Sequence, residues 1–457
     1  MSAIDKFLFT AGMEGFNDPS SIPSVGIVVP FFGVEEFAEA DAEQAQRMTE
    51  MNQQANAIYK LQETLVYIDA HRPNFDRSNA EHVVQALGDV QVLLPNMEDP
   101  VTIMGSLEHY TPAYTSHLLG HGLEGIGSQI MAIIKKVIEL LKKGWDFLNK
   151  AIQAKGVIFG KQKRELDELG DWFKEQRKNG TAAPAKSNGD AKVISITAPT
   201  YLYTVDSNKP LSSDRLISEV RKYTGFIRAF HRDFITRQIM LGDLIIRAIN
   251  SADIASTPND QLFVKVFKGQ FSFNGVGGTT LYSKRDGDQV DLAMVGLIGG
   301  IGFKAKLNSA LVSPVEMTPD GSNQRKFFKQ MQFLHNYSFT SKINMDGSST
   351  GGAPIYACNV NDAENLTHEL STLAAAINVV PYDTDVRDFN KRVTDCVTKL
   401  GNMADTMSHD RSDFITTMIN ALSGLSSGLE QLTRGMNQQS NTLLNNVREY
   451  VTKSVKE

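Results

Sequence analysis

The sequence predicts an α+β protein that is predominantly helical, with a small antiparallel β-sheet region around 193–205 and 261–315. Three observations support this fold class. Long segments near both ends carry apolar residues three or four positions apart, which is the spacing of an amphipathic helix. In the middle of the chain, apolar and polar residues instead alternate within segments that end at glycines, as they do in antiparallel strands. Finally, 41% hydrophobic and 21% charged residues indicate a globular chain rather than a disordered one.

The first predicted helix covers 35–70, a stretch without glycine or proline that is rich in helix-forming residues. Its first turns are strongly acidic, which suits the positive end of the helix dipole. A short second helix is expected at 78–87. After it, the chain is interrupted by Pro95, Pro100 and Pro112.

An amphipathic helix dominates the next segment, 125–178. Its apolar residues recur every three or four positions and lysines fall between them, which predicts one apolar stripe and one basic face. A charged helix is expected to follow at 161–178, so that 125–178 forms a helix pair. The small polar residues of 179–192 predict a flexible linker. The apolar interaction face consists of Ile130, Ile134, Val137, Leu141, Trp145, Leu148 and Ile152.

A mixed α/β body is expected at 193–361. Clustered β-branched and aromatic residues predict a strand at 193–205. A helix is expected over 212–249, where a serine can cap its start. The alternating and glycine-bounded segment 261–315 then predicts a small sheet.

The C-terminal region, 362–457, returns to a helical pattern. From Phe414 to Val451 the apolar residues follow steps of three and four along the chain. A stripe of this length has to be covered, so the sequence predicts a partner for this helix, either within the chain or on another copy.

No pattern in the sequence predicts an active site. Cys358 and Cys396 lack the number and spacing of a disulfide framework or metal site, so both are expected to be reduced thiols. His117 and His121 are four residues apart, but the three glycines of "TSHLLGHGLEG" predict a loop rather than a metal-binding helix. The glycine-rich 296–304 lacks the Gly-Lys-Ser/Thr ending of a phosphate loop. We therefore expect no enzymatic activity, no cofactor and no metal.

Charge is divided unevenly along the chain. Residues 1–124 contain 18 acidic and 5 basic residues, a net charge of −13, whereas the whole chain carries −6 and 125–457 therefore carries +7. Such a division suggests different partners for the two parts. The start of the chain lacks the basic residues and apolar run of a secretory signal, so synthesis in a cytoplasm is expected.

A small-x-Glu tripeptide stands where charge sign and periodicity both change. It directly precedes the amphipathic helix, and the sequence predicts that this helix begins after the glutamate. A second tripeptide of the same kind lies a little earlier in the chain. The first motif is Gly122, Leu123 and Glu124, and the second is Ser106, Leu107 and Glu108.

This order of features resembles the internal head proteins (inner-body or head core proteins) of large tailed bacteriophages, the giant myoviruses in particular. The resemblance runs from "MSAIDKFLFTAGMEGF" through the acidic segment to the charged helix at 161–178, and nothing specific is recognised after 193. It implies that 1–124 is a propeptide, which a prohead protease removes after a small-x-Glu motif during capsid maturation.

The resemblance also implies a location and a set of partners. The mature protein would be packed inside the capsid with other virion proteins, copies of itself and DNA, and some members of the family are ejected into the host. No helix-turn-helix, zinc finger or aromatic-basic surface is evident, so contact with DNA is expected to be independent of sequence. Loss of an acidic propeptide would favour that contact, since the remaining chain is positively charged.

Other functions remain open at this stage. A tail or baseplate structural protein would keep its N-terminus intact in the mature particle. A membrane-active effector would use the helix at 130–152, whose lysine face and Trp145 suit a membrane surface. An enzyme would need a polar pocket with converging titratable groups.

Overall fold

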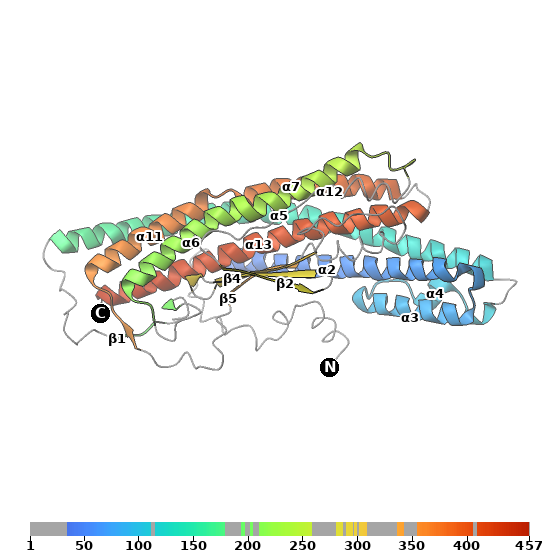
Figure 1. Ribbon diagram of the computed structural model, residues 1–457, viewed down its shortest axis with the longest axis horizontal. Helices are drawn as coiled ribbons and strands as arrows, with labels where there is room; N and C mark the ends of the chain where they lie inside the picture. The colour runs from blue at the N-terminus through green and yellow to red at the C-terminus, as the bar shows by residue number, and fades with distance from the viewer. Residues whose placement is uncertain are drawn as a thin grey trace.

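The protein is an elongated helical bundle with small antiparallel sheets, which confirms the predicted fold class (Figure 1). The helices lie side by side along the longest axis of the molecule. The predicted linker at 179–192 lies outside the described residues. This computed structural model describes residues 34–110, 115–178, 193–196, 202–203, 210–257, 280–286, 289–295, 297–298, 301–308, 336–341, 354–404 and 409–456.

Two long parallel helices form the axis of the bundle. They run in the same direction, since Gly144 of the first lies beside Glu430 of the second, and Gln162 further along donates a hydrogen bond to Asn441. Both helices contact most of the other helical elements, so the rest of the bundle is arranged around them. They are α5 (Thr115–Lys178) and α13 (His409–Lys456).

Two further helical rods run antiparallel to this axis and alongside each other. Ser213 contacts Asp362 near one end, and Lys399 contacts Asn250 near the other. Both pairs are 149 positions apart, so the rods keep one register over their whole length. One rod is α6 (Ser213–Phe230), the π-helix η4 (His231–Ile235) and α7 (Thr236–Ser251), and the other is α11 (Val360–Val379) and α12 (Tyr382–Ala404).

Both rods are interrupted at the same level. In one of them Pro381 ends the helix, because proline has no N–H to donate and holds the preceding Val380 in an extended conformation. In the other, the π-helix widens the turn, and the N–H of Thr236 bonds to the carbonyl of His231. Here His231 Nε2 lies 2.7 Å from an Asp385 carboxylate oxygen, which joins the two interruptions.

The C-terminal helix α13 is the central element. Between 414 and 430 almost every residue is buried, whichever side of the helix it faces. Many of these residues are small, which lets neighbouring helices approach closely. The partner predicted for this stripe is therefore found within the chain, in α2, α5, α7, α11, α12 and the sheet strand β5.

One end of the rod is built from the N-terminal helices and the first half of α5 (Figure 1). Here α2 runs antiparallel to α5, and α3 folds back on it after a turn. Asp76 and Asn79 form a capping box at the start of α3, each bonding the other's backbone. The elements are α2 (Val34–His71), η1 (Arg72–Asn74), α3 (Arg77–Leu93), α4 (Pro100–Met104) and η2 (Leu107–His109).

Two sheets lie beside the bundle. The four-stranded sheet is an antiparallel meander in the order β2-β3-β4-β5, and β5 packs against α13. Its first three strands fall within the predicted region 261–315, whereas β5 was not predicted. The strands are β2 (Thr280–Asp286), β3 (Gln289–Val295), β4 (Ile301–Asn308) and β5 (Asn336–Ser341).

The described residues of the predicted strand at 193–205 are strand only at its start. Among them β1 (Val193–Ile194) is the strand, and it pairs with β6 (Ile355–Tyr356) in a two-stranded sheet. Leu202 and Tyr203 are buried but not extended in a sheet, so their apolar side chains serve the core instead. A cluster of β-favouring residues therefore marked burial here rather than strand pairing.

The predicted helix pair at 125–178 is wrong, because α5 is one continuous helix from 115 to 178. Glycines do not break it, since several of them sit where another element passes closely. A Cβ on Gly122 would come within 2.8 Å of Met104 Sδ, and one on Gly125 within 2.9 Å of Ile103 Cγ2. Packing against α4 therefore compensates for the low helix propensity of glycine.

Candidate functional site

The motif Gly122-Leu123-Glu124 lies inside helix α5. Gly122 is buried against α4, Leu123 is half-buried and only Glu124 is exposed. The expectation that the helix begins after Glu124 is wrong, because the helix already includes Thr115. A protease that binds an extended strand would have to unwind this end of α5 before cutting there.

The motif Ser106-Leu107-Glu108 lies in the connection between α4 and α5. Gly105 precedes it with φ of 79°, a conformation that favours glycine and ends α4. Ser106 and Glu108 are exposed, and the segment forms only a short 3₁₀ turn. Tyr110 closes the turn, donating a hydrogen bond from its hydroxyl to the Met104 carbonyl at 2.7 Å. This motif is therefore more accessible than the one inside α5.

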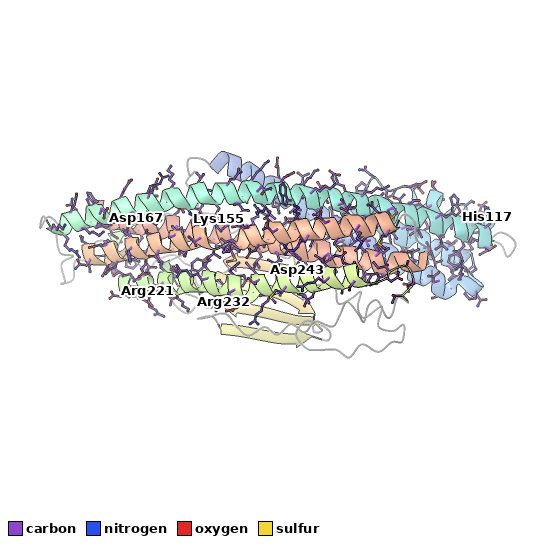
Figure 2. All side chains as sticks on the ribbon, turned by 90° about the horizontal axis from the view of Figure 1, so that it is seen from above. His117, Lys155, Asp167, Arg221, Arg232 and Asp243 are labelled. Carbon is purple, nitrogen blue, oxygen red and sulfur yellow. The ribbon has the colours of Figure 1, made fainter. Side chains whose placement is uncertain are left out.

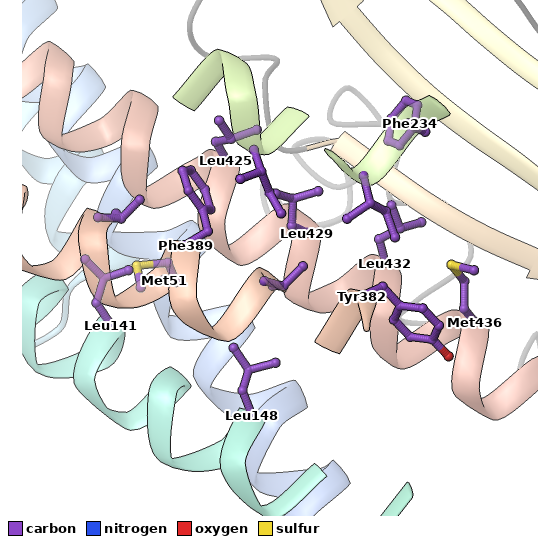
Figure 3. Close-up of a cluster of buried hydrophobic side chains, with 14 of the residues drawn as sticks. Met51, Leu141, Leu148, Phe234, Tyr382, Phe389, Leu425, Leu429, Leu432 and Met436 are labelled. Atoms are coloured by element: carbon purple, nitrogen blue, oxygen red, sulfur yellow. The ribbon is translucent and has the colours of Figure 1, made fainter. Parts of the chain in front are cut away.

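The predicted apolar face is buried at five of its seven positions, namely 130, 134, 137, 141 and 148. Trp145 is instead 38% exposed, and Ile152 is half-buried. The buried stripe departs from the predicted one because the buried positions repeat every eleven residues, a period close to that of a straight α-helix. The members at this spacing are Leu140, Ala151, Gln162 and Phe173. The aliphatic part of the core continues onto α12 and α13 around Leu141 and Leu148 (Figure 3).

A first buried polar cluster connects α2 to the bundle. Arg47 pairs with Glu430 of α13, and its guanidinium also donates to the Leu140 carbonyl at 3.0 Å. Asn390 of α12 donates to the same Glu430 carboxylate at 2.8 Å. These groups fit beside α5 because Gly144 has no side chain: a Cβ there would lie 2.6 Å from Arg47 Nη1. Burial lowers the pKa of Arg47 to about 10, so it stays charged at neutral pH.

A second buried polar cluster connects α5, α12 and α13. Lys155 Nζ lies 2.7 Å from Asp383 Oδ2, and Asn437 Nδ2 donates to Asp383 Oδ1 at 3.1 Å. Tyr382 donates from its hydroxyl to Asn437 Oδ1, and the Lys155 ammonium sits 3.8 Å from the centre of the Tyr382 ring. Lys155 also donates to the Val380 carbonyl at 3.0 Å. Burial raises the pKa of the Asp383 carboxyl, although Lys155 opposes that shift.

Neither cluster was predicted from the sequence. Lys155 was not singled out there, although its side chain is only 6% exposed and points into the bundle. A signal was present, because Lys155 is eleven residues after Gly144 and four after Ala151, on the buried stripe. Figure 2 shows Lys155 along α5, between His117 near one end and Asp167 near the other.

The two histidines considered as metal ligands do lie on one helix. His117 is exposed, and His121 contacts the Ile103 carbonyl at 3.3 Å. The predicted loop is wrong, but no group of three or more potential metal ligands occurs in the part of the chain that the structure describes. None of the described helices combines the length and apolar character needed to cross a bilayer.

Comparison with protein family models, with curated proteins and with solved structures finds no match to this chain. Two features of the molecule bear on its function: the small-x-Glu motifs at the acidic end, and the buried polar clusters of the bundle.

Proposed function

We propose that this chain is an internal head protein of a large tailed bacteriophage, a virion structural protein rather than an enzyme. It would be matured by prohead-protease cleavage after a small-x-Glu motif and would lie inside the capsid against packaged DNA. The observation that carries this proposal is the position of Ser106-Leu107-Glu108. An exposed cleavage motif lies in the connection that joins the acidic N-terminal helices to the positively charged remainder.

The buried charges support a structural role. Lys155 and Asp383 are paired inside the bundle, as are Arg47 and Glu430, and each pair joins different helices. Buried ion pairs of this kind specify which helices meet and in which register. Groups that act on a substrate from outside the chain would instead have to face that substrate.

The division of charge coincides with the division of the fold. The acidic segment forms α2, α3 and α4, and its cleavage would remove the covalent connection to α5. Release of the cut segment would also require Arg47 to leave Glu430, so cleavage alone loosens the acidic end rather than removing it. Cleavage at Glu108 follows more readily from the fold than cleavage at Glu124, since it needs no unwinding of α5.

The outer face of α5 supplies positive charges for DNA. Lys135, Lys142 and Lys150 are exposed and make no ion pair within the described part of the chain. Contacts of this type bind phosphates without reading sequence. The same helix supports a membrane-active function less well, because its apolar stripe is already covered by other helices.

The maturation proposal is tested by mass spectrometry of the N-terminus of the protein from its native particles. We expect a chain that begins at residue 109 or at residue 125. Co-expression with the cognate protease then distinguishes the sites, since Glu108→Ala and Glu124→Ala each remove one motif and leave the other. An intact N-terminus in mature particles would contradict the proposal and favour a tail or baseplate protein.

The DNA proposal is tested by fluorescence anisotropy of a labelled duplex at two salt concentrations, using the mature protein. We expect a dissociation constant of roughly 10⁻⁴ to 10⁻⁶ M that rises steeply with salt, because each neutralised phosphate releases counterions. Changing Lys135, Lys142 and Lys150 to Gln should flatten the salt dependence. The matched control changes three paired lysines, Lys163, Lys174 and Lys222, to Gln. Equal effects of the two triple variants would mean that the unpaired lysines Lys135, Lys142 and Lys150 are not the proposed contact.

A further inference from the structure

The cluster around Lys155 contains more than an ion pair. An ion pair needs one cation and one anion, but here a single carboxylate contacts two different nitrogens. Asp383 Oδ2 faces the Lys155 amine at 2.7 Å and Asp383 Oδ1 faces the Asn437 amide nitrogen at 3.1 Å. The amide oxygen of Asn437 accepts a hydrogen bond from the Tyr382 hydroxyl. Tyr382 is fully buried, and the other three side chains are at most 7% exposed.

These four side chains bring together the kinds of group that transfer of an acyl group from an amide to an amine uses, arranged around one carboxylate. The nucleophilic nitrogen of Lys155 and the leaving nitrogen of Asn437 each contact one oxygen of the Asp383 carboxylate, which would act as the acid-base group. A hydroxyl donor points at the oxygen on which negative charge would develop. Water, which would compete as nucleophile, is excluded by burial.

We propose that this cluster forms an intramolecular isopeptide bond between the side chains of Lys155 and Asn437. In the folded chain a proton passes from the Lys155 ammonium to the Asp383 carboxylate. Burial raises the pKa of Asp383, which favours its protonated form. The free amine of Lys155 is then able to attack the amide carbon of Asn437.

The step balances without any co-reactant. The Lys155 nitrogen forms a bond to Cγ of Asn437, and Tyr382 stabilises the oxyanion with its hydroxyl. Asp383 gives its proton to the departing amide nitrogen and takes one from the attacking nitrogen. The bond from Cγ to Nδ2 breaks and ammonia leaves, so the products are a secondary amide, ammonia and a protonated Asp383. No oxidation or reduction occurs.

The first polar cluster supplies a comparison within the same bundle. Asn390 there also donates to a buried carboxylate, that of Glu430. Its cation is Arg47, however, and a guanidinium that remains protonated is not a nucleophile. In addition, Asn390 Oδ1 has no hydrogen-bond donor among the residues that the structure describes, whereas Asn437 Oδ1 has Tyr382. The geometry therefore assigns the reaction to one of the two clusters.

The bond would connect α5 to α13, the two parallel helices of the axis. It would replace a buried pair of charges by a neutral amide and close a long loop of chain, which constrains the unfolded state. The rod would then resist separation of its axis helices. This inference does not depend on the proposed function, because the chemistry uses only groups of the folded chain.

The experiment is an intact-mass measurement of the denatured full chain, followed by peptide mapping. We expect a mass below that of the sequence by one ammonia molecule, and a branched peptide that joins the segments around Lys155 and Asn437. Lys155→Arg should restore the mass of its own sequence, and so should Asp383→Ala. Lys150→Arg, a change at an exposed lysine of the same helix, should keep the loss.

Three results would overturn the proposal. The first is a full chain with the unreduced mass of its sequence. The second is a loss of water instead of ammonia, which would make Asp383 the acceptor rather than the acid-base group. The third is a loss of ammonia that survives Lys155→Arg, because that points to a succinimide at an asparagine. Since the unsubstituted chain gives the decisive mass, the test does not depend on a variant that folds.

Discussion

The two ends of the rod are stabilised in different ways. At the N-terminal end the core is made mainly of aliphatic and methionine side chains from α2, α3, α4 and the start of α5, such as Leu61, Leu87 and Met104. The ion pairs of that end among the described residues are exposed, as is Lys60 with Asp89. The main bundle has an aliphatic core too, but it also encloses Arg47 with Glu430 and Lys155 with Asp383.

This difference explains how the helices of a long bundle keep their register. Aliphatic layers repeat along a helix. If helices pack only through such layers, sliding one helix by one repeat gives nearly the same packing stabilisation. A buried charge has one acceptable position, because any shift leaves it without a partner at a cost of several kcal/mol. The polar groups are also spaced regularly, seven residues apart on α12 (383 and 390) and on α13 (430 and 437).

The largest expected effect comes from removing one member of a buried pair. Arg47→Met leaves Glu430 charged and unpaired in the core, and we expect the free energy of unfolding to fall by about 3–5 kcal/mol. The measurement is chemical denaturation of the full chain. The control at the other end is Lys60→Met, whose partner is exposed, with an expected loss of less than about 1 kcal/mol. Similar losses in the two variants would break the comparison between the ends.

A charge placed in the aliphatic part of the bundle should be almost as damaging. Leu141 is fully buried, so we expect Leu141→Asp to cost about 3 kcal/mol or more, and Ile134→Asp to behave alike. Trp145→Asp on the same helix is the matched control, because Trp145 is partly exposed. Thermal melting distinguishes them. A melting temperature of Leu141→Asp within a degree or two of the parent would mean that this face of α5 is not covered.

Alanine substitutions at three glycines of α5 should give smaller and graded effects. Gly144→Ala places a methyl group against Arg47 and Glu430, and we expect a loss of about 1–3 kcal/mol from overpacking. The close contacts of Gly122→Ala are with the flexible end of Met104, and the Ile103 carbonyl lies at an ordinary 3.8 Å, so its loss should be smaller. Gly127→Ala meets nothing within 4 Å and should stabilise the helix by about 0.5–1 kcal/mol. Equal results for all three would mean that close packing does not explain these glycines.

The smallest expected effect concerns a surface contact between α5 and α11. Hydrogen bonds from Lys163 and then from Ser371 lower the pKa of Asp167 below its ordinary value of 3.8. This contribution to stability is therefore present above the unfolded pKa and is lost as pH falls through the folded pKa. Asp167→Asn should cost less than about 1 kcal/mol at pH 7, since water screens a half-exposed carboxylate. Denaturation at pH 7 and pH 3 should show a smaller difference for the variant than for the parent.

Much of the fold follows from the sequence alone. Composition and capping identified the helices at 35–70 and 212–249, apolar spacing identified the helical region at 362–457, and alternation identified the sheet that includes β2, β3 and β4. These features are local, because each depends on which residues recur at 3.6 or at 2 positions along one segment. The burial of most of the amphipathic face, including Leu141, follows from the same pattern.

The tertiary structure decided what local patterns do not contain. It made α5 continuous through its glycines, because Ile103 and Met104 pack where a side chain would otherwise stand. It placed Lys155 inside the bundle, since its partner Asp383 comes from a helix more than two hundred residues away. It also separated the two small-x-Glu motifs, with Glu108 in a connection and Glu124 in a helix. The sequence determined which segments could form helices, and long-range packing determined where they end, which charges they enclose and which motif is exposed.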